Sequence, residues 1–265
     1  MRYIDCKTYS QEILDAVKAI PDKKKLVILT AGDNPASQSY VKGKIKDCEY
    51  CGIPYEHIKL ENTESAKSEL RYHINQANLV DDVSGIIVQL PLPAGFDEHQ
   101  YTNMVRLDKD VDGFSQNSPY KPCTPEGIMY LLRKELGDLT GKTALVIGRG
   151  KLVGEPIANM LVDADCTVTI AHSKTKNLNG LLTKPDIIIS AVGKPNLVDL
   201  TYCSNAQIVI DAGISRDANG KLVGDCYNFS DKYRDFLKVT PVPGGVGLMT
   251  RAMLMAHTAN LNINI

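Results

Sequence analysis

The sequence lacks long apolar runs, an excess of charge of either sign and a regular cysteine framework. No apolar stretch approaches membrane-spanning length, and the first residues hold no apolar signal core. The formal net charge is −1, so no general attraction to nucleic acid or to a membrane is expected. The seven cysteines are scattered and odd in number, which argues against a secreted disulfide framework. These absences predict a cytoplasmic protein in a reducing compartment, without nucleic-acid or membrane partners.

One Cys-x-x-Cys pair needs separate treatment. Cys48 and Cys51 fall near the end of an expected helix, whereas redox pairs gain reactivity at a helix N-terminus. No second pair of Cys or His completes a zinc site. We therefore expect two packed thiols and no bound metal. The one basic run, at 23–25, precedes an apolar strand and is interpreted as a solvated strand entry.

Apolar strand-like runs alternate with helical patterns in two series along the chain. This alternation is typical of parallel sheets that are buried on both faces. The first series has expected strands at 26–30, 53–60 and 84–90, with expected helices at 36–51 and 64–78. The second has expected strands at 143–147, 167–171, 186–190 and 208–211, with expected helices at 124–136, 153–161 and 176–181.

We therefore expect an α/β protein of two domains, an N-terminal α/β substrate domain and a Rossmann-type parallel-sheet cofactor domain, with a cleft between them. The polar, turn-rich stretch 115–122 indicates the boundary. The expected substrate domain comprises residues 1–116 and is joined by a C-terminal helical segment, 248–265. The expected cofactor domain comprises residues 117–247.

A glycine-rich turn lies between the expected strand 143–147 and the next helix. It reads Gly148-Arg-Gly-Lys-Leu-Val-Gly154, one residue longer than the common dinucleotide fingerprint. A strand, a glycine turn and a helix N-terminus together can bind a pyrophosphate, although a βα turn without ligand is the alternative. The following strand ends without the acid that is usual for NAD. Arg149, Ser173 and Lys174 could instead hold a ribose phosphate, which favours NADP over NAD, and a merely polar loop at 172–174 is the alternative.

Two further stretches follow apolar strands at the edge where ligands bind in open α/β sheets. They are Ala191–Pro195 and Asp211–Ile214. Gly193 and Gly213 would let the nicotinamide end of a dinucleotide approach the main chain. Each stretch alone could be an ordinary turn, but two in series favour a binding role.

Candidate catalytic residues lie in the first half of the chain. Tyr40 and Lys44 are four apart and share a helix face, which suggests either a proton-transfer pair or a solvated surface. Gln89 lies near the end of an apolar strand, where its amide needs a partner. Asp110 and Asp112 follow in a loop, where they could form turns or bind the N–H groups of a heterocycle.

A loop rich in proline and glycine, Thr240-Pro-Val-Pro-Gly-Gly-Val-Gly247, follows the second series. Its prolines restrict φ and its glycines leave the backbone bare. Such a loop can present main-chain groups to a flat ligand at close range. A surface loop of ordinary turn formers is the alternative.

Together these segments resemble the methylenetetrahydrofolate dehydrogenase/methenyltetrahydrofolate cyclohydrolase family, in the order of its motifs and over almost the whole chain. The motifs are Pro35-Ala-Ser-Gln-x-Tyr-Val-x-x-Lys44, Val88-Gln-Leu-Pro-Leu-Pro93, Lys109-Asp-Val-Asp-Gly113, Pro122-Cys-Thr-Pro-x-Gly127, Gly148-Arg-x-x-x-Val-Gly-x-Pro156 and Thr240–Gly247.

The resemblance implies a bifunctional enzyme that uses NADP to oxidise 5,10-methylenetetrahydrofolate, so that tetrahydrofolate is the substrate carrier, and hydrolyses the methenyl product to 10-formyltetrahydrofolate. It implies that Lys44 handles protons in the cyclohydrolase step, that Gln89 supports it, that Tyr40 stacks on the folate and that Asp112 binds the pterin. The other implied folate contacts are Leu90, Pro91, Pro243, Gly244 and Gly245. The implied NADP contacts are Gly148, Arg149, Gly150, Val153, Gly154, Ser173, Gly193, Ile214 and Thr124. The resemblance also implies a homodimer through the cofactor domain.

Three departures from the family pattern are visible. Gly150 replaces a usual Ser, Leu248 replaces a usual Pro, and the connection 114–122 is short. The first removes one potential phosphate contact, and the last affects the domain hinge and the cleft entrance. Two alternatives stay open, namely a monofunctional member of the family and a non-catalytic NADP-binding sensor. The presence of Lys44, Gln89 and Asp112 speaks against the sensor.

Overall fold

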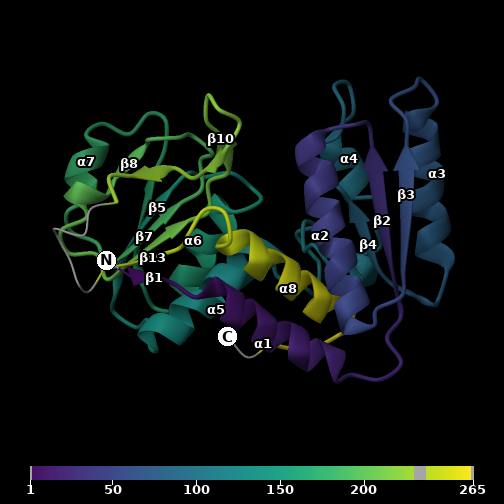
Figure 1. Cartoon of the computed structure of the whole chain (residues 1–265), viewed down its shortest axis with the longest axis horizontal. Coiled ribbons are helices and arrows are strands. Elements are labelled where there is room, and N and C mark those ends of the chain that lie inside the picture. Colours follow the sequence, from purple (N-terminus) through teal and green to yellow (C-terminus); the bar gives the residue numbers. More distant parts are fainter. Residues whose placement is uncertain (1, 230–236, 264–265) are drawn as a thin grey trace. The chain divides into compact units, whose positions relative to one another are not determined.

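The protein is described by a computed structural model over residues 2–229 and 237–263 (Figure 1). The described residues form two compact units. One unit comprises residues 2–10 and 124–250, and the other comprises residues 11–123 and 251–263. Both are built on parallel sheets, so the expected two-domain α/β fold is confirmed. No helix within the described ranges is both long enough and apolar enough to cross a membrane.

The unit with residues 11–123 has a three-stranded parallel sheet in the order β3-β2-β4. Six residues of the central strand are buried, as its apolar run predicts. Figure 1 shows helices on opposite sides of these strands, α2 on one and α3 on the other. The strands are β2 (Lys25–Ala31), β3 (Tyr55–Leu60) and β4 (Val83–Val88), and the helices are α2 (Pro35–Cys51), α3 (Ala66–Leu79), α4 (Glu98–Thr102) and the 3-10 turn η1 (Leu107–Lys109).

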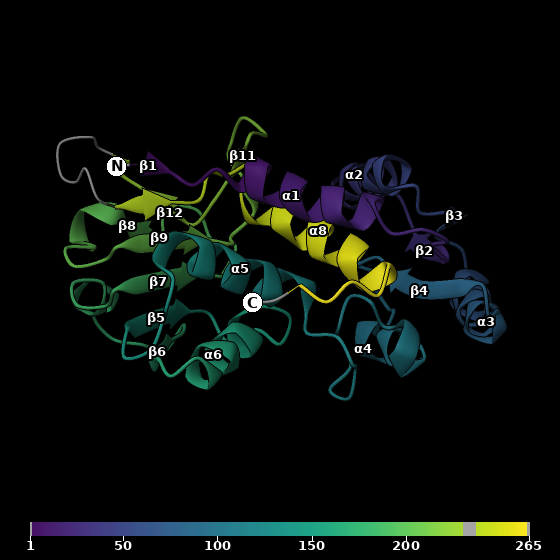
Figure 2. The same cartoon turned by 90° about the horizontal axis from the view of Figure 1, so that it is seen from below.

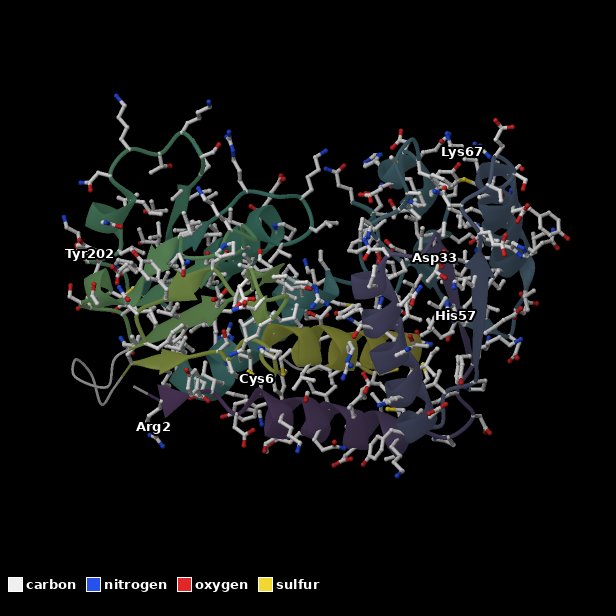
Figure 3. The ribbon with its side chains drawn as sticks, turned by 45° about the horizontal axis from the view of Figure 1, so that its top comes forward. Arg2, Cys6, Asp33, His57, Lys67 and Tyr202 are labelled. Carbon is white, nitrogen blue, oxygen red and sulfur yellow. The ribbon has the colours of Figure 1, made fainter. Side chains whose placement is uncertain are left out.

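Polar side-chain contacts link the β2 and β3 regions in addition to the backbone hydrogen bonds between these strands. Thr30 Oγ1 lies 3.0 Å from His57 Nε2, and Lys59 forms an ion pair of 3.0 Å with Asp33, which follows the end of β2. Figure 3 labels His57 and Asp33 in this unit. Burial is the main cause that lowers the pKa of His57, with the charge of Lys59 second. The carboxyl ends of β2 and β4 lead into the segments that carry the candidate catalytic residues.

The unit with residues 124–250 has a six-stranded sheet in the order β1-β13-β9-β7-β5-β6, with every pair parallel (Figure 2). The chain leaves β5 for β6 on one side and then returns to β7 on the other, so the strand order reverses at β5. Ligands bind open α/β sheets at this kind of switch point. The strands of the sheet are β1 (Arg2–Tyr3), β5 (Thr143–Ile147), β6 (Thr167–Ala171), β7 (Ile187–Ser190), β9 (Ile208–Asp211) and β13 (Lys238–Val239).

Short elements complete this unit. The short strands form two separate pairs, antiparallel β10 (Ser215–Arg216) with β11 (Leu222–Val223) and parallel β12 (Cys226–Tyr227) with β8 (Val198–Asp199). Its helices are α5 (Cys123–Leu136), α6 (Gly154–Asp163), α7 (Leu178–Leu181) and the 3-10 turn η2 (Leu200–Tyr202). Three helices, α1 (Cys6–Lys18), α5 and α8 (Val246–Thr258), have residues in both units, α5 through Cys123 alone.

The N-terminal residues differ from the expected domain division. Residues 2–10 group with 124–250, because the two-residue strand β1 pairs with β13 and so joins the larger sheet. The expected substrate domain had included them. Both residues of β1 are exposed, and two residues carry no periodicity, so the sequence offers no signal for this strand.

Candidate active site and cofactor site

Lys44 and Tyr40 lie one turn apart on α2. Lys44 is only 3% exposed, and its Nζ lies 5.2 Å from the centroid of the Tyr40 ring. A cation over an aromatic face at this distance is stabilised by the ring quadrupole. The interpretation of this pair as a solvated helix face is therefore wrong for Lys44. A buried amine beside an aromatic ring suits proton transfer to a flat ligand.

Asp112 is buried in the same unit, and the charge of Lys44 affects the pKa of its carboxyl. Burial raises the pKa of the Asp112 carboxyl, and the positive charge of Lys44 is the largest effect that opposes the rise. The neighbouring carboxylate of Asp110 raises the pKa of Asp112 further. Lys44 and Asp112 thus belong to one electrostatic cluster, although they are far apart in the sequence.

The rest of the Lys109–Gly113 motif holds Asp112 in place. Asp110 accepts hydrogen bonds from the backbone N–H groups of Phe114 and Ser115, at 3.3 and 2.8 Å. Gly113 has φ +70, and a Cβ there would lie 2.4 Å from the carbonyl oxygen of Lys121. The turn role that was open for both aspartates therefore belongs to Asp110, and Asp112 remains available to a ligand.

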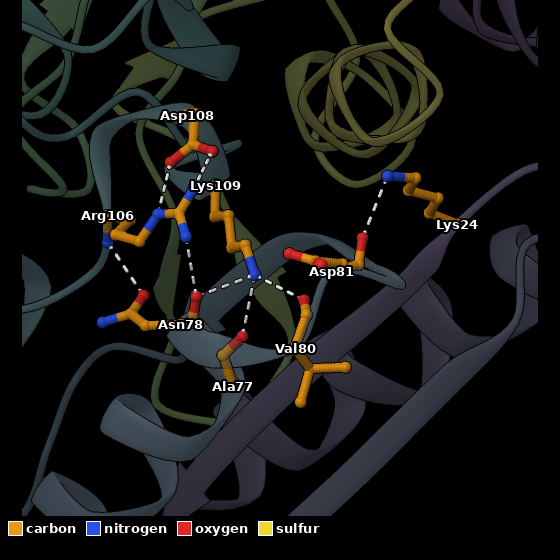
Figure 4. A network of polar contacts seen from close by, with 8 residues as sticks. All are labelled: Lys24, Ala77, Asn78, Val80, Asp81, Arg106, Asp108 and Lys109. Carbon is orange, nitrogen blue, oxygen red and sulfur yellow. Dashed lines mark hydrogen bonds and ion pairs between the residues drawn. The ribbon is translucent and has the colours of Figure 1, made fainter.

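Lys109 anchors this motif to the end of α3 (Figure 4). Its buried Nζ donates to the carbonyl oxygens of Ala77, Asn78 and Val80, at 3.0, 3.0 and 2.6 Å. These carbonyls belong to the last turn and the C-cap of α3, and each also accepts one weaker or more exposed bond, from Val80 N, Arg106 Nη1 and Val83 N respectively. A cation there interacts favourably with the helix dipole. Lys109 therefore acts as a C-terminal cap of α3, a role that the sequence did not reveal.

Gln89 follows β4 directly and carries a buried acceptor. Its backbone N–H donates to Leu29 in β2, and its side-chain Nε2 donates to the carbonyl oxygen of Leu90 at 2.7 Å. Its Oε1 is buried and has no hydrogen-bond partner among the described residues. An unpartnered buried acceptor is costly, which fits a ligand that donates to it. Leu90 and Pro91 follow Gln89, with Leu90 half-buried and Pro91 exposed.

An ion pair between Asp47 of α2 and Arg251 of α8 was not expected from the sequence. Asp47 Oδ2 and Arg251 Nε are 2.9 Å apart, outside hydrogen-bond geometry but close enough for charge pairing. Burial raises the pKa of Asp47, and Arg251 opposes this rise. The guanidinium fills the space over Gly43, where a Cβ would lie 1.8 Å from Arg251 Nη1. A glycine inside a helix was the available signal.

The pair Cys48 and Cys51 lies on α2 with both side chains buried. Burial raises the pKa of each thiol to about 12. The Cys51 thiol donates to the carbonyl oxygen of Leu14. Because the thiolate is the reactive form, these thiols are poor nucleophiles and poor metal ligands. The described residues contain no cluster of three or more His, Cys, Asp or Glu that could hold a metal ion.

The glycine turn after β5 has the geometry of a dinucleotide site. Gly148 has φ +106, and a Cβ there would lie 2.5 Å from the carbonyl oxygen of Ala191. A Cβ on Gly154 would lie 2.4 Å from the carbonyl oxygen of Gly148, so this glycine lets α6 pack closely on the turn. Gly150 is exposed and has open space around its Cβ position. Val153 is the N-cap of α6 and makes no side-chain cap hydrogen bond, and a helix N-terminus of this kind can bind a phosphate.

Arg149 and Ser173 leave neighbouring strands at the same level. Ile147 in β5 is paired with Ala171 in β6, and each candidate follows two residues later. Both are exposed, as a phosphate contact requires. Thr124, at the start of α5, is bonded instead within the protein, since its Oγ1 lies 2.9 Å from Thr250 Oγ1.

The loops after β7 and β9 lie side by side and expose apolar side chains. Gly193 has φ +70, and its carbonyl oxygen accepts a 2.7 Å hydrogen bond from Ser215 Oγ. Val192 and Ile214 are 45% and 59% exposed. Exposed apolar groups at the carboxyl edge of a parallel sheet are suited to the face of an aromatic ring.

Residues 240–245 connect β13 to α8, so the predicted loop 240–247 includes the first two residues of that helix. Thr240 is buried, and its Oγ1 accepts a 2.8 Å hydrogen bond from the backbone N–H of Asp211. Gly245 is buried where a Cβ would lie 2.2 Å from the carbonyl oxygen of Pro241. Pro243 and Gly244 are exposed, with φ +92 at Gly244. The tip is therefore bare backbone held by a buried base.

Comparisons with known proteins agree with this geometry. Residues 4–112 match the family described as tetrahydrofolate dehydrogenase/cyclohydrolase, catalytic domain, and residues 122–264 match its NAD(P)-binding domain. The bifunctional protein FolD of Lachnoclostridium phytofermentans is 43% identical, over 95% of this chain and 94% of its own.

Two solved structures extend the comparison. The crystal structure of the bifunctional dehydrogenase/cyclohydrolase FolD from Campylobacter jejuni is 39% identical, covers 98% of both chains and has a TM-score of 0.88. The Trypanosoma brucei FolD, solved with NADP cofactor and inhibitor, is 30% identical, covers 97% of this chain and 95% of its own, and has a TM-score of 0.88. The chain therefore belongs to the tetrahydrofolate dehydrogenase/cyclohydrolase family, and its expected identity as an enzyme with both activities is confirmed.

Proposed function

We propose that the chain divides its two reactions between two sets of residues, with proton transfer in the unit of residues 11–123 and cofactor binding in the unit of residues 124–250. The observation that carries this proposal is the buried Lys44 amine, which lies over Tyr40 and interacts with the charge of Asp112. No comparable buried lysine is described among the cofactor candidates.

The two reactions differ in their need for this amine. In the dehydrogenase step, a hydride leaves the methylene carbon for the nicotinamide ring, and no proton moves. In the cyclohydrolase step, water oxygen bonds to the methenyl carbon, and the bond from that carbon to one ring nitrogen breaks. Water loses two protons, of which one ends on the freed nitrogen and one is released. Lys44 handles these protons, and Gln89 supports it through its unpartnered Oε1.

The folate is held by neighbouring groups. Tyr40 stacks on the flat ring system, and Asp112 accepts from pterin N–H groups. Leu90 and Pro91 border the ring beside Gln89. The family resemblance assigns Pro243, Gly244 and Gly245 to the folate as well, and the first two of these residues are exposed.

Replacing Lys44 with methionine tests this division. Cyclohydrolase activity should fall by about 10² to 10⁴, the usual contribution of general acid–base catalysis, while hydride transfer stays within about tenfold of wild type. The matched control is Lys42→Met, an exposed lysine on the same helix, which should change neither activity. If both activities of Lys44→Met stay at the wild-type level, Lys44 has no part in the mechanism.

We propose that the cofactor is NADP, with tetrahydrofolate as the carrier of the one-carbon unit. The support is an exposed Arg149 and Ser173 at one level of adjacent strands, with no acid at the end of β6. The pyrophosphate is expected on the turn of Gly148, Gly150, Val153 and Gly154. Thr124, Gly193 and Ile214 line the path toward the nicotinamide.

Steady-state oxidation of 5,10-methylenetetrahydrofolate with each nucleotide tests the preference. Charge-assisted contacts contribute about 1.5–3 kcal/mol, so Arg149→Ala should lose about 10- to 100-fold of its kcat/KM with NADP and little with NAD. Equal or better use of NAD by the wild-type enzyme would overturn the roles of Arg149 and Ser173.

A homodimer through the cofactor unit is also proposed. The support is the edge strand β6, where Ile170 is 45% exposed, and the nearby Val162 of α6, which is 57% exposed. Unpaired sheet edges with apolar side chains favour association. Sedimentation at micromolar concentration should give twice the chain mass of 29.0 kDa, and a monomer there would refute this assembly.

A further inference from the structure

Two buried carboxylates lie beneath the loops that follow β7 and β9. Asp225, which directly precedes β12, is 0% exposed, and Asp211, the last residue of β9, is also buried. No ion pair to either is described among residues 2–229 and 237–263. Buried carboxylates without a cation need several hydrogen-bond donors, and here backbone N–H groups supply most of them.

Asp225 uses both oxygens to hold the loop after β7. Its Oδ2 accepts from Ser190 Oγ at 2.7 Å and from the N–H of Val192 at 3.0 Å, and its Oδ1 accepts from the N–H of Lys194 at 2.7 Å. The loop between these amides is turned at Gly193, whose carbonyl faces the other way and accepts from Ser215 Oγ. The loop is therefore fixed from both sides.

Asp211 holds Asp225 in turn. Its Oδ1 accepts from the N–H groups of Gly213 and Asp225, both at 3.0 Å, and its Oδ2 accepts from the N–H of Cys226 at 2.9 Å. The two carboxylates are packed without spare room. A Cβ on Gly213 would lie 2.1 Å from Asp225 Oδ1, and a Cβ on Gly224 would lie 2.1 Å from Asp211 Oδ2.

We propose that Asp225 is a positioning residue for hydride transfer, which fixes Val192 and Ile214 as the wall behind the nicotinamide ring. This inference rests on the proposed cofactor site. Because the amides of Val192 and Lys194 are bound to Asp225, the loop cannot turn them outward, and the apolar side chain of Val192 stays exposed. The link from Ser215 to Gly193 holds the loop of Ile214 at the same edge. Positioning of this kind matters for hydride transfer, because small misplacements of reacting atoms are costly.

Asp225→Asn changes one atom and breaks the arrangement. An amide has one acceptor oxygen, so its NH2 group would face either the N–H of Lys194 or the N–H of Val192, and that donor would lose its partner. Loss of one such bond displaces the loop after β7. The turn after β5 that carries Arg149 is bonded to β6 through Gly148 N–H and to Ala191 through Ile147 O, and among the described residues it makes no hydrogen bond with the Asp225 carboxylate.

The test compares two ligands on the full-length enzyme, NADP and 2′-phospho-ADP-ribose, which lacks the nicotinamide. In Asp225→Asn the affinity for NADP and the kcat/KM of hydride transfer should each fall about tenfold or more, since the cost of an unpaired buried donor exceeds about 1.4 kcal/mol. The affinity for 2′-phospho-ADP-ribose and the cyclohydrolase kcat/KM should change less than about twofold. A merely structural role would weaken both ligands together.

The control is Asp186→Asn. Asp186 directly precedes β7 and so lies at the amino ends of the strands, opposite the loops that Asp225 holds. Asp186 also accepts from backbone and side chains, namely Thr143 N at 2.9 Å, Thr143 Oγ1 at 2.8 Å and Gln207 Nε2 at 3.2 Å. This variant should lose stability without separating the two ligands. If Asp225→Asn does not fold, Ser190→Ala removes one donor to Asp225 and should show the same separation on a smaller scale.

The outcomes are distinct. Equal loss of affinity for NADP and 2′-phospho-ADP-ribose, or unchanged kinetics, in Asp225→Asn or in Ser190→Ala overturns the positioning role. Loss confined to NADP and hydride transfer supports it. Failure of the wild-type enzyme to oxidise methylenetetrahydrofolate with NADP would instead refute the proposed cofactor, whatever the variants do.

Discussion

Replacing Lys109 with methionine isolates the contribution of its buried ammonium to the loop that carries Asp112. Methionine keeps a flexible apolar stem of similar size but donates no hydrogen bond. Three contacts to the carbonyl oxygens at the end of α3 then disappear. The end of α3 should loosen, and the Asp112 loop should lose its anchor.

The expected loss follows from these contacts. A hydrogen bond from a charged donor contributes about 1.5–3 kcal/mol, but water can replace part of it where the carbonyls are accessible. Val80 is exposed and Asn78 is half-buried, while burial lowers the pKa of Lys109 and so already disfavours its charge. A net loss of about 2–4 kcal/mol is therefore expected, which lowers the melting temperature by roughly 5–15 °C.

Thermal unfolding and the KM for the methenyl folate together measure the effect. Lys24→Met is the matched control, since Lys24 Nζ also donates to a backbone carbonyl, that of Asp81 at 2.9 Å, but at an exposed position (Figure 4). It should change stability by less than about 0.5 kcal/mol. Equal losses in the two variants, or an unchanged folate KM in Lys109→Met, would refute the anchoring role.

Two further substitutions probe buried charges. Burial raises the pKa of the Asp112 carboxyl above 3.8, so the folded protein binds the carboxyl proton more tightly than the unfolded chain does. Wild type should therefore lose stability relative to Asp112→Asn as the pH rises from about 4 through the raised pKa. At neutral pH Asp112→Asn should be more stable than wild type but should have a higher KM for the folate. Urea unfolding at several pH values measures the stability of both proteins, and a less stable variant at neutral pH would contradict this prediction. Gly43→Ala should destabilise by about 1–2 kcal/mol despite the better helix propensity of alanine, because the new Cβ displaces Arg251 from Asp47. A gain of stability in denaturant unfolding would contradict this reasoning.

Strands β5, β7 and β9 of the larger sheet were predictable because nearly all of their residues are buried, whereas the edge strand β6 is mostly exposed. The bounds of β5, β6 and β9 agree with the predicted 143–147, 167–171 and 208–211. Continuous apolar runs next to glycine turns carry this signal locally. The predicted helix at 176–181 is only Leu178–Leu181, where the N-cap Asn177 has φ 53 and starts the helix later.

Helix α1 was missed although its buried residues follow helical spacing. Cys6, Ser10, Ile13 and Val17 are all buried, but two of the four are small or polar, so the apolar stripe covers little more than one turn of the sequence. The two-residue strands β8 and β10 to β13 are too short for any periodicity. Their pairing depends on long-range contacts.

Some of the site residues could be predicted from the sequence, because their residue type stands out or because they lie in a motif of the family. Gln89 is a polar group at the end of an apolar strand, and it is buried. Lys44 lies between Lys42 and Lys46, so its role was predicted from the family resemblance, and its burial appears only in the structure. Asp225 was missed because its importance lies in which amides surround it, and these come from a loop more than thirty residues earlier. The anchoring by Lys109 was missed for the same reason.

The enclosed position of Asp211 and Asp225 has a consequence for ionic strength. Mobile ions screen exposed charges over about 10 Å at 0.1 M salt but act much less on groups sealed from solvent. Added salt should therefore lower the affinity for NADP mainly by screening the exposed Arg149, the residue proposed to bind the phosphate on the adenosine ribose. The position of Val192 and Ile214, the proposed wall behind the nicotinamide ring, should not change between low and high salt.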